Sequence, residues 1–198
     1  MTPFVARLAV LLLCLPVMAC GAGTSSRGDD PANRPVMRWD NHPQAATWTR
    51  ASLRALSGPG AALPATVPND IAAWCPAYPK ASPAQRRAFW AGLFSALAKY
   101  ESTWNPRAVG GGGRYIGLMQ ISPATARYHG CAATSPKALK DGAANLRCAI
   151  RIAAASVPRD GVVAAGGGGV AADWGPMTVA EKREEIAAWT RAQPYCGG

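Results

Sequence analysis

Apolar residues along the chain recur at the spacing of helices. In the segment 82–100, Trp90, Phe94 and Leu97 fall within about 40° of one line when each residue is turned by about 100°. No run of alternating apolar and polar residues long enough for a strand interrupts the segments of this kind. The pattern therefore predicts a mainly α domain.

Polar residues next to proline mark where several of these helices begin. Ser82 and Pro83, with Gln85 behind them, supply an N-cap, a proline in the first turn and a capping-box partner. Further starts are predicted at Ser122-Pro123, at Ser135-Pro136, near Asp141 and at Thr178 with Glu181. A shorter helix is expected from Trp48 to Leu56, ahead of the first of these starts.

The acidic residue Glu101 lies on the apolar line of the long helix, eleven residues after Trp90, where the helix is expected to end. Burial disfavours the ionised carboxylate, and the negative end of the helix dipole acts in the same direction, so both raise the pKa. A carboxylic acid that keeps its proton near neutral pH can act as a general acid. The helix alone is equally compatible with a surface glutamate that reaches water or pairs with Arg107.

Two motifs follow Glu101 in order. They are Glu101-Ser102 with Trp104-Asn105-Pro106, and Gly117-Leu118-Met119-Gln120-Ile121 with Pro123 and Thr125. Together they resemble the lytic transglycosylase family, the lysozyme-like enzymes that cut bacterial peptidoglycan, over about Phe89 to Pro176. The resemblance implies a mainly α, lysozyme-like domain with a glycan-binding cleft, in which Glu101 is the catalytic acid and base.

The same resemblance implies a set of substrate-binding residues: Ser102, Tyr115, Met119, Gln120, Asn145, Asp173 and Trp174. Two positions depart from the family pattern. The usual serine nine residues after the glutamate is Gly110, and the tyrosine of the later motif is replaced by Ala172. Trp174 or Tyr115 is expected to supply the missing aromatic wall.

The chemistry implied by the resemblance needs one carboxylate. Most glycosidases use two, but Asp141, Asp160 and Asp173 match no family nucleophile. Glu101 would protonate the oxygen that links N-acetylmuramic acid to N-acetylglucosamine, while the substrate's acetamide stabilises the developing cation. It would then take the proton of the 6-hydroxyl, which closes a 1,6-anhydro ring, with no metal and no cofactor. Two alternatives stay open: a peptidoglycan-hydrolysing lysozyme on the same fold, and a non-catalytic wall-binding or assembly factor.

The charge of the chain favours an anionic partner. The 198 residues carry a formal net charge of +10. No helix-turn-helix, zinc-finger or RNA-binding signature is present, so we expect no nucleic acid. Anionic cell-wall polymers and membrane surfaces remain as partners, and we expect the protein to be a monomer.

The N-terminus predicts export. Residues 1–19 contain one cation and an apolar run too short to span a bilayer, as in a signal peptide. Val17 to Gly21 resemble a lipoprotein box, with Cys20 as the lipid-bearing residue; ordinary cleavage nearby is the alternative. Residues 20–44 are expected to be a flexible tether and 45–198 the folded domain. The protein would then be lipid-anchored in the bacterial cell envelope.

Cysteine usage agrees with an oxidising compartment. Beyond residue 20 the chain has Cys75, Cys131, Cys148 and Cys196, an even number. Sequence alone leaves three pairings open. We favour Cys131 with Cys148, which closes a short loop between helices, and Cys75 with Cys196, which joins the two ends of the domain. The spacings do not suit a metal site.

Overall fold

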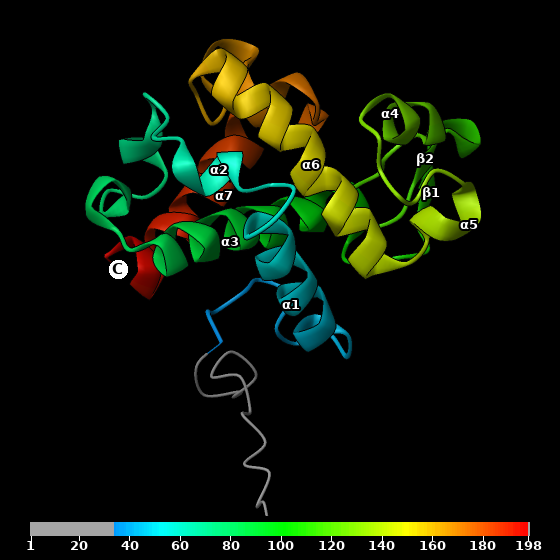
Figure 1. Ribbon diagram of the computed structural model, residues 1–198, viewed down its shortest axis with the longest axis horizontal. Coiled ribbons are helices and arrows are strands. Elements are labelled where there is room, and N and C mark those ends of the chain that lie inside the picture. Colours follow the sequence, from blue (N-terminus) through cyan, green and yellow to red (C-terminus); the bar gives the residue numbers. More distant parts are fainter. Residues whose placement is uncertain (1–33, 198) are drawn as a thin grey trace, which may run out of the picture. The chain divides into compact units, whose positions relative to one another are not determined.

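A 20-residue helix, α3 (Pro83–Ser102), runs through the middle of the part of the chain that the computed structural model describes, residues 34–197 (Figure 1). Every residue from Ala88 to Ala98 is buried. Such a helix is enclosed on all sides rather than packed on one face. Trp90, Phe94 and Leu97 are all fully buried, so the apolar line predicted from the sequence lies in the core.

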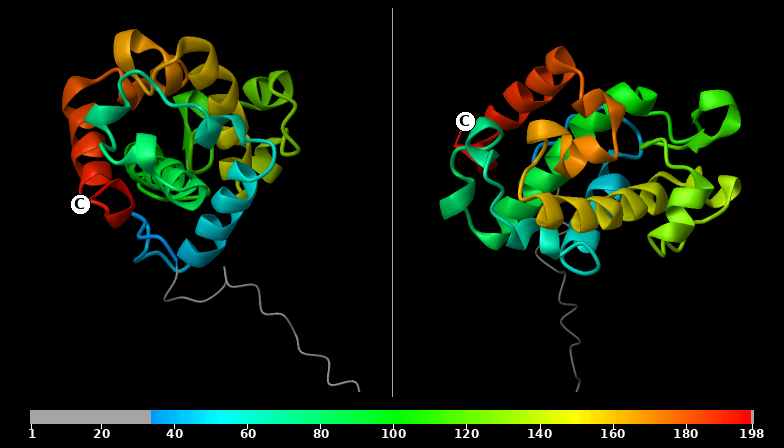
Figure 2. Two further views of the ribbon diagram at one scale, coloured as in Figure 1. Left: turned by 60° about the vertical axis from the view of Figure 1, so that its left-hand side comes forward. Right: turned by 90° about the horizontal axis from the view of Figure 1, so that it is seen from above.

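Shorter helices surround α3 (Figures 1 and 2). They are α1 (Ala45–Leu56), α2 (Ala62–Ala65), α4 (Pro123–Tyr128), α5 (Pro136–Leu139), α6 (Gly142–Asp160) and α7 (Ala180–Arg191), with 3-10 turns at Ile71–Ala73, Tyr78–Lys80, Gly111–Gly113, Ala165–Gly167, Gly169–Ala172, Gly175–Met177 and Pro194–Cys196. Helices α1, α2 and α7 contact α3, and α1 also packs on α6. The prediction of a mainly α domain is confirmed. Within residues 34–197, no helix is long and apolar enough to cross a membrane.

The predicted helix starts are confirmed at all but one position. Ser82 and Gln85 form the capping box: the Ser82 hydroxyl accepts from the Gln85 N–H at 3.3 Å, and the Gln85 side chain accepts from the Ser82 N–H at 2.9 Å. The side chains of Ser122, Ser135 and Asp141 cap α4, α5 and α6, and each accepts the N–H of the residue three positions further on. The start at Thr178 is wrong, because its hydroxyl donates backwards to Gly175 O at 2.8 Å and α7 begins after Val179.

A small hairpin follows α3. Strands β1 (Val109–Gly110) and β2 (Tyr115–Ile116) pair antiparallel, and the glycines between them have φ of 55°, 65° and 97°. The left-handed region is open to glycine without steric cost, which explains the glycine run at this turn. The apolar pattern predicts no strand here, because two residues are too few to show an alternation.

The segment before α1 belongs to the folded unit. Met37 and Trp39 are 2% and 1% exposed and lie in the core. The tether predicted over 20–44 is therefore wrong from Arg34 onward, because two apolar residues in polar surroundings gave no sign of burial. The rest of the tether, the signal peptide and Cys20 lie outside the described residues.

Two disulfides tie the domain together. Cys75 is bonded to Cys196, 121 residues away, and Cys131 to Cys148, 17 residues away. The favoured pairing is confirmed. The first bond joins the region before α3 to the C-terminus, and the second joins the end of α4 to α6, so the hairpin region is fixed to the longest outer helix.

Candidate active site

Glu101 lies in the last turn of α3, with a side chain that is only partly exposed. The helix ends directly after it, because Thr103 and Trp104 both adopt left-handed conformations, with φ of 51° and 56°. The Trp104 N–H still reaches back to Ala98 O at 3.3 Å. The backbone therefore turns away sharply and leaves the Glu101 carboxyl at the edge of the core.

The environment of Glu101 favours its protonated form. Burial raises the pKa of Glu101 from 4.5 to about 7, and the positive charge of Lys182 on α7 acts in the opposite direction. No donor within residues 34–197 hydrogen-bonds the carboxylate to stabilise the anion, so burial dominates. The predicted effect of burial is confirmed. The protonated form is therefore favoured much nearer to neutral pH than for an ordinary glutamate.

The Gly-Leu-Met-Gln motif forms a tight turn directly beside Glu101. Ser102, the next residue of α3, donates from its hydroxyl to Leu118 O at 2.9 Å. From the other side, the indole N–H of Trp174 donates to Met119 O at 3.0 Å. The turn is thus held to the end of α3 and to the segment before α7 through its backbone carbonyls.

Asn145 on α6 fixes the same turn from inside. Its side chain accepts from the Met119 N–H at 2.8 Å and donates to Ile116 O at 2.9 Å and to Leu139 O at 3.0 Å. Gly117 allows this close approach: its φ is 83°, and a Cβ there would lie 2.2 Å from Leu139 O and 2.4 Å from the Asn145 amide nitrogen. The motif therefore needs glycine at this position.

Gln120 and Gly110 fit against each other between the turn and the hairpin. The Gln120 amide donates to Gly117 O at 2.9 Å. Its Oε1 lies so close to Gly110 that a Cβ on that glycine would be 2.3 Å away. A serine at position 110, as in the family pattern, would require the end of the Gln120 side chain to move away. The glycine that stands at position 110 in place of the family serine therefore leaves room for the Gln120 side chain.

Three predicted substrate-binding residues are buried. Met119 and Asn145 are fully buried, and Trp174 is 4% exposed, edge-on against Phe94 with ring centroids 5.9 Å apart. These side chains hold the turn from behind and do not reach a surface. The expectation that they contact glycan is corrected accordingly, and Trp174 does not supply an aromatic wall.

The other predicted residues are accessible. Tyr115 is 39% exposed on β2, and Asp173 is exposed on the segment before α7, next to the exposed Ala172. Ser102 and Gln120 are partly exposed beside the turn. Contact of these residues with glycan stays a prediction, with Tyr115 as the remaining candidate for the aromatic wall.

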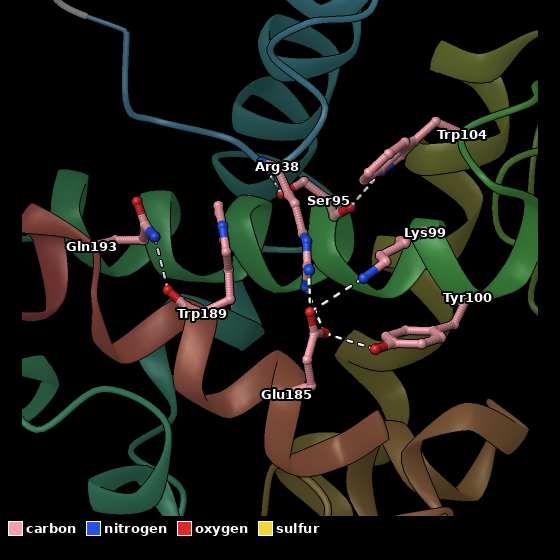
Figure 3. A network of polar contacts seen from close by, with 8 residues as sticks. All are labelled: Arg38, Ser95, Lys99, Tyr100, Trp104, Glu185, Trp189 and Gln193. Atoms are coloured by element: carbon pink, nitrogen blue, oxygen red, sulfur yellow. Dashed lines mark hydrogen bonds and ion pairs between the residues drawn. The ribbon is translucent and has the colours of Figure 1, made fainter. Parts of the chain in front are cut away.

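A polar network that the sequence did not reveal joins α7 to the end of α3 (Figure 3). Glu185 on α7 accepts from Nη1 and Nη2 of the Arg38 guanidinium, from Tyr100 at 2.9 Å and from Lys99 at 3.3 Å. Arg38 is the main reason that the pKa of Glu185 is lowered to about 2. Lys182, the cation that acts on Glu101, lies three residues before Glu185 on α7, with its Nζ 5.6 Å from the centroid of the Tyr100 ring.

The sequence pattern contained only part of the information needed to predict this network. The spacing of Lys182 and Glu185 places them on one face of a helix, but that face was expected to be solvated. Arg38 lay in the segment expected to be a tether. Its guanidinium could be assigned to Glu185 only once the segment 34–44 was seen to pack on α3.

Within the described part of the chain, no group of three or more His, Cys, Asp or Glu side chains could hold a metal ion. The arrangement around Glu101 instead offers one carboxyl group with a pKa near neutrality. Such a group can donate a proton to a leaving group and then accept one from an attacking hydroxyl.

Comparison with known proteins agrees with the sequence motifs. Residues 80–156 match the family model of the transglycosylase SLT domain, which confirms the resemblance over α3, the hairpin and most of α6. Solved structures of DslA, its wild-type form 2 and two mutants with glutamine in place of glutamate, superpose with TM-scores of 0.74 to 0.75 at 28% identity. The alignment covers 82% of this chain and 98% of DslA. A search of curated proteins finds no match.

Proposed function

We propose that the protein is a lytic transglycosylase that cleaves the glycan strands of peptidoglycan, with Glu101 as its single general acid and base. The observation that carries this proposal is the partly buried Glu101 carboxyl, with a pKa of about 7, beside the Gly-Leu-Met-Gln turn. The SLT-domain match and the likeness to DslA support a function on peptidoglycan.

Protonated Glu101 gives its proton to the oxygen between N-acetylmuramic acid and N-acetylglucosamine. The substrate's acetamide stabilises the cation that develops as the bond breaks. The resulting Glu101 carboxylate then removes the proton of the muramic acid 6-hydroxyl, whose oxygen forms the 1,6-anhydro bond. Glu101 thus donates one proton and accepts one, so it returns to its starting protonation state. A pKa near 7 suits both proton donation and proton acceptance.

The other acids support a single-carboxylate mechanism. Asp160 is paired with Arg159 and Glu185 with Arg38, and these contacts lower the pKa of each carboxylate to about 2. Asp141 caps α6 through the Ala144 N–H at 2.7 Å. These three carboxylates are engaged with partners of their own, whereas burial shifts the pKa of Glu101 toward neutrality.

The test is digestion of purified peptidoglycan followed by mass spectrometry of the soluble products. We expect muropeptides that end in 1,6-anhydro-N-acetylmuramic acid from the wild type and none from Glu101→Gln. Glu181→Gln, which alters an exposed carboxylate in the first turn of α7, is the control and should retain activity. Reducing ends in place of anhydro ends would identify a lysozyme. Binding to peptidoglycan without release from any variant would identify a non-catalytic factor.

We also propose that the protein is exported, carries lipid on Cys20 and acts as a monomer in the cell envelope. Metabolic labelling with a radioactive fatty acid tests the anchor: the wild type should be labelled and Cys20→Ser should not. Equal labelling of the two proteins, or none of either, would remove the anchor from the proposal and leave the enzymatic part untouched.

A further inference from the structure

A cleft lies on the face of α7 that carries Glu184, Ala187 and Arg191. It has a volume of about 600 Å³ and is bounded by α7, the turn Ile71–Ala73 and the loop 164–167, and Glu101 is not among its lining residues. In Figure 1 the loop, drawn in orange, lies beside α7 at the far end of α6. The volume is within the range that holds a small organic ligand or a short peptide.

Two arginines of α7, Arg183 and Arg191, line this cleft. Each guanidinium is bonded to backbone carbonyls through one nitrogen, Nη1. Arg183 donates from Nη1 to Met177 O at 3.2 Å and to Thr178 O at 3.4 Å. Arg191 donates from Nη1 to Ala73 O. Within residues 34–197 neither makes a salt bridge, and neither uses Nε or Nη2 in a hydrogen bond. Each guanidinium therefore presents free donors on a side chain that is already ordered, which suits bidentate binding of a carboxylate.

The other polar groups of the cleft indicate which further groups a bound ligand would carry besides carboxylates. Asp70 is engaged, because its two oxygens accept the N–H groups of residues 163–165 at 2.6 to 3.0 Å and so shape the loop. Glu184 is exposed among the lining residues and makes no salt bridge within the described chain. It can accept an ammonium group. The remaining wall is largely small and apolar, formed by the side chains of Ala73, Ala164, Ala165 and Ala187.

We infer that this cleft binds an alanine-containing peptide that carries two carboxylates and a free amine. Arg183 and Arg191 are eight residues apart on one helix, so their backbone positions differ by about 12 Å along the axis. An extended peptide covers this distance in about four residues. The two guanidinium groups bind the carboxylates, Glu184 binds the amine, and the alanine wall accommodates methyl side chains.

This chemistry is that of the peptide stem on N-acetylmuramic acid, so the inference rests on the proposed function and specifies its substrate. Arg183 directly follows Lys182, the residue whose charge acts on Glu101. At about 100° per residue, Glu184, Ala187 and Arg191 point away from the side of α7 that carries Lys182, so the cleft and the acid lie on different faces of this helix. The inference requires a stem to extend from a glycan strand at Glu101 around α7 to the cleft.

Binding is measured by calorimetry on the full chain carrying Glu101→Gln, so that no turnover interferes. The probe is N-acetyl-L-Ala-γ-D-Glu-diaminopimelate, whose single free amine is that of diaminopimelate, compared with the same peptide amidated at its carboxylates. Arg183→Gln with Arg191→Gln should weaken binding of the probe by about tenfold or more. Arg54→Gln with Arg147→Gln removes the same charge from exposed positions outside the cleft and should change it less than twofold. Glu184→Gln should weaken binding of this peptide but not of N-acetyl-L-Ala-γ-D-Glu, which has no free amine.

Equal binding of the amidated peptide, or equal loss in the two arginine pairs, would overturn the inference. Cleavage of glycan strands stripped of stems tests the proposed function separately, because the arginine pair in the cleft should leave it unchanged. With stem-bearing strands as substrate, Arg183→Gln with Arg191→Gln should raise the KM, and Arg54→Gln with Arg147→Gln should not. An unaltered KM in the first pair would show that the cleft binds free peptide alone, and would refute the assignment of the stem as its ligand. Unchanged thermal unfolding of both pairs shows that the fold is kept.

Discussion

Replacing Glu101 by glutamine should stabilise the protein at high pH and leave its stability unchanged at low pH. In the folded protein the pKa of Glu101 is raised from 4.5 to about 7 by burial. A difference of this size corresponds to about 3 kcal/mol between the protonation states. Because the side chain keeps some contact with solvent, we expect about 2 kcal/mol in practice. Glutamine is neutral and similar in shape, so the variant carries no such cost.

The sign follows from proton binding. Below pH 4.5 the carboxyl is protonated in both the folded and the unfolded chain, and burial costs no ionisation energy. Between pH 4.5 and about 7 the folded state holds the proton while the unfolded state has lost it. The free energy of unfolding therefore falls across this window as pH rises. Above pH 7 the full cost is present in the wild type.

Thermal unfolding of wild type and Glu101→Gln at pH 4 and pH 8 measures this difference. A cost of about 2 kcal/mol corresponds to a Tm roughly 4–8 °C higher for the variant at pH 8, and the two proteins should coincide at pH 4. Glu181→Gln, on an exposed carboxylate of α7, should follow the wild type at both pH values. Parallel curves for wild type and Glu101→Gln would show that the carboxyl is solvated, and the argument for a proton-donating acid would fail.

Three further substitutions test the parts around the acid. Asn145→Ala removes three buried hydrogen bonds and should lower the free energy of unfolding by about 3 kcal/mol in denaturant titration; a change below about 1 kcal/mol would contradict its supporting role. Gly110→Ser should reduce the rate of peptidoglycan release by displacing Gln120, and adding Gln120→Ala should relieve the steric part; a single variant as active and stable as the wild type would refute the contact. Cys131→Ser with Cys148→Ser should cost about 3 kcal/mol on the chain-entropy model, and an unchanged Tm would show that the bond does not constrain the unfolded chain.

The parts of the fold that the sequence predicted are those encoded by local spacing. The apolar line of α3 and the position of Glu101 on it follow from residues within twelve positions of one another. The caps at Ser82 and Asp141 likewise depend on a partner three residues away. The disulfide pairing involves distant residues, but with four cysteines there were only three choices. Thr178 shows the limit, because its hydroxyl had a competing acceptor in the preceding turn.

The parts that were not predicted depend on contacts across long stretches of chain. Arg38 and Glu185 are 147 residues apart, and nothing near either residue marks the other as its partner. The segment 34–44 is polar in composition, yet Met37 and Trp39 are enough to fix it to the core. Tertiary contacts of this kind leave no periodic trace in a single sequence.

The roles of Met119, Asn145 and Trp174 show why a motif can identify a site and still mislead about its surface. The resemblance placed these residues in the glycan groove, but their polar atoms bind one another through the backbone of a single turn. A buried turn has N–H and C=O groups that must be satisfied; Asn145 and Trp174 bond the N–H and C=O of Met119, and Asn145 also bonds the C=O of the adjacent Ile116. The residue types are thus required by the shape of the turn, and the shape sets where Gln120 and Ser102 lie relative to Glu101. In the proposed function, glycan would contact the exposed edge of the turn, and the buried side chains of Asn145 and Trp174 hold that edge in place.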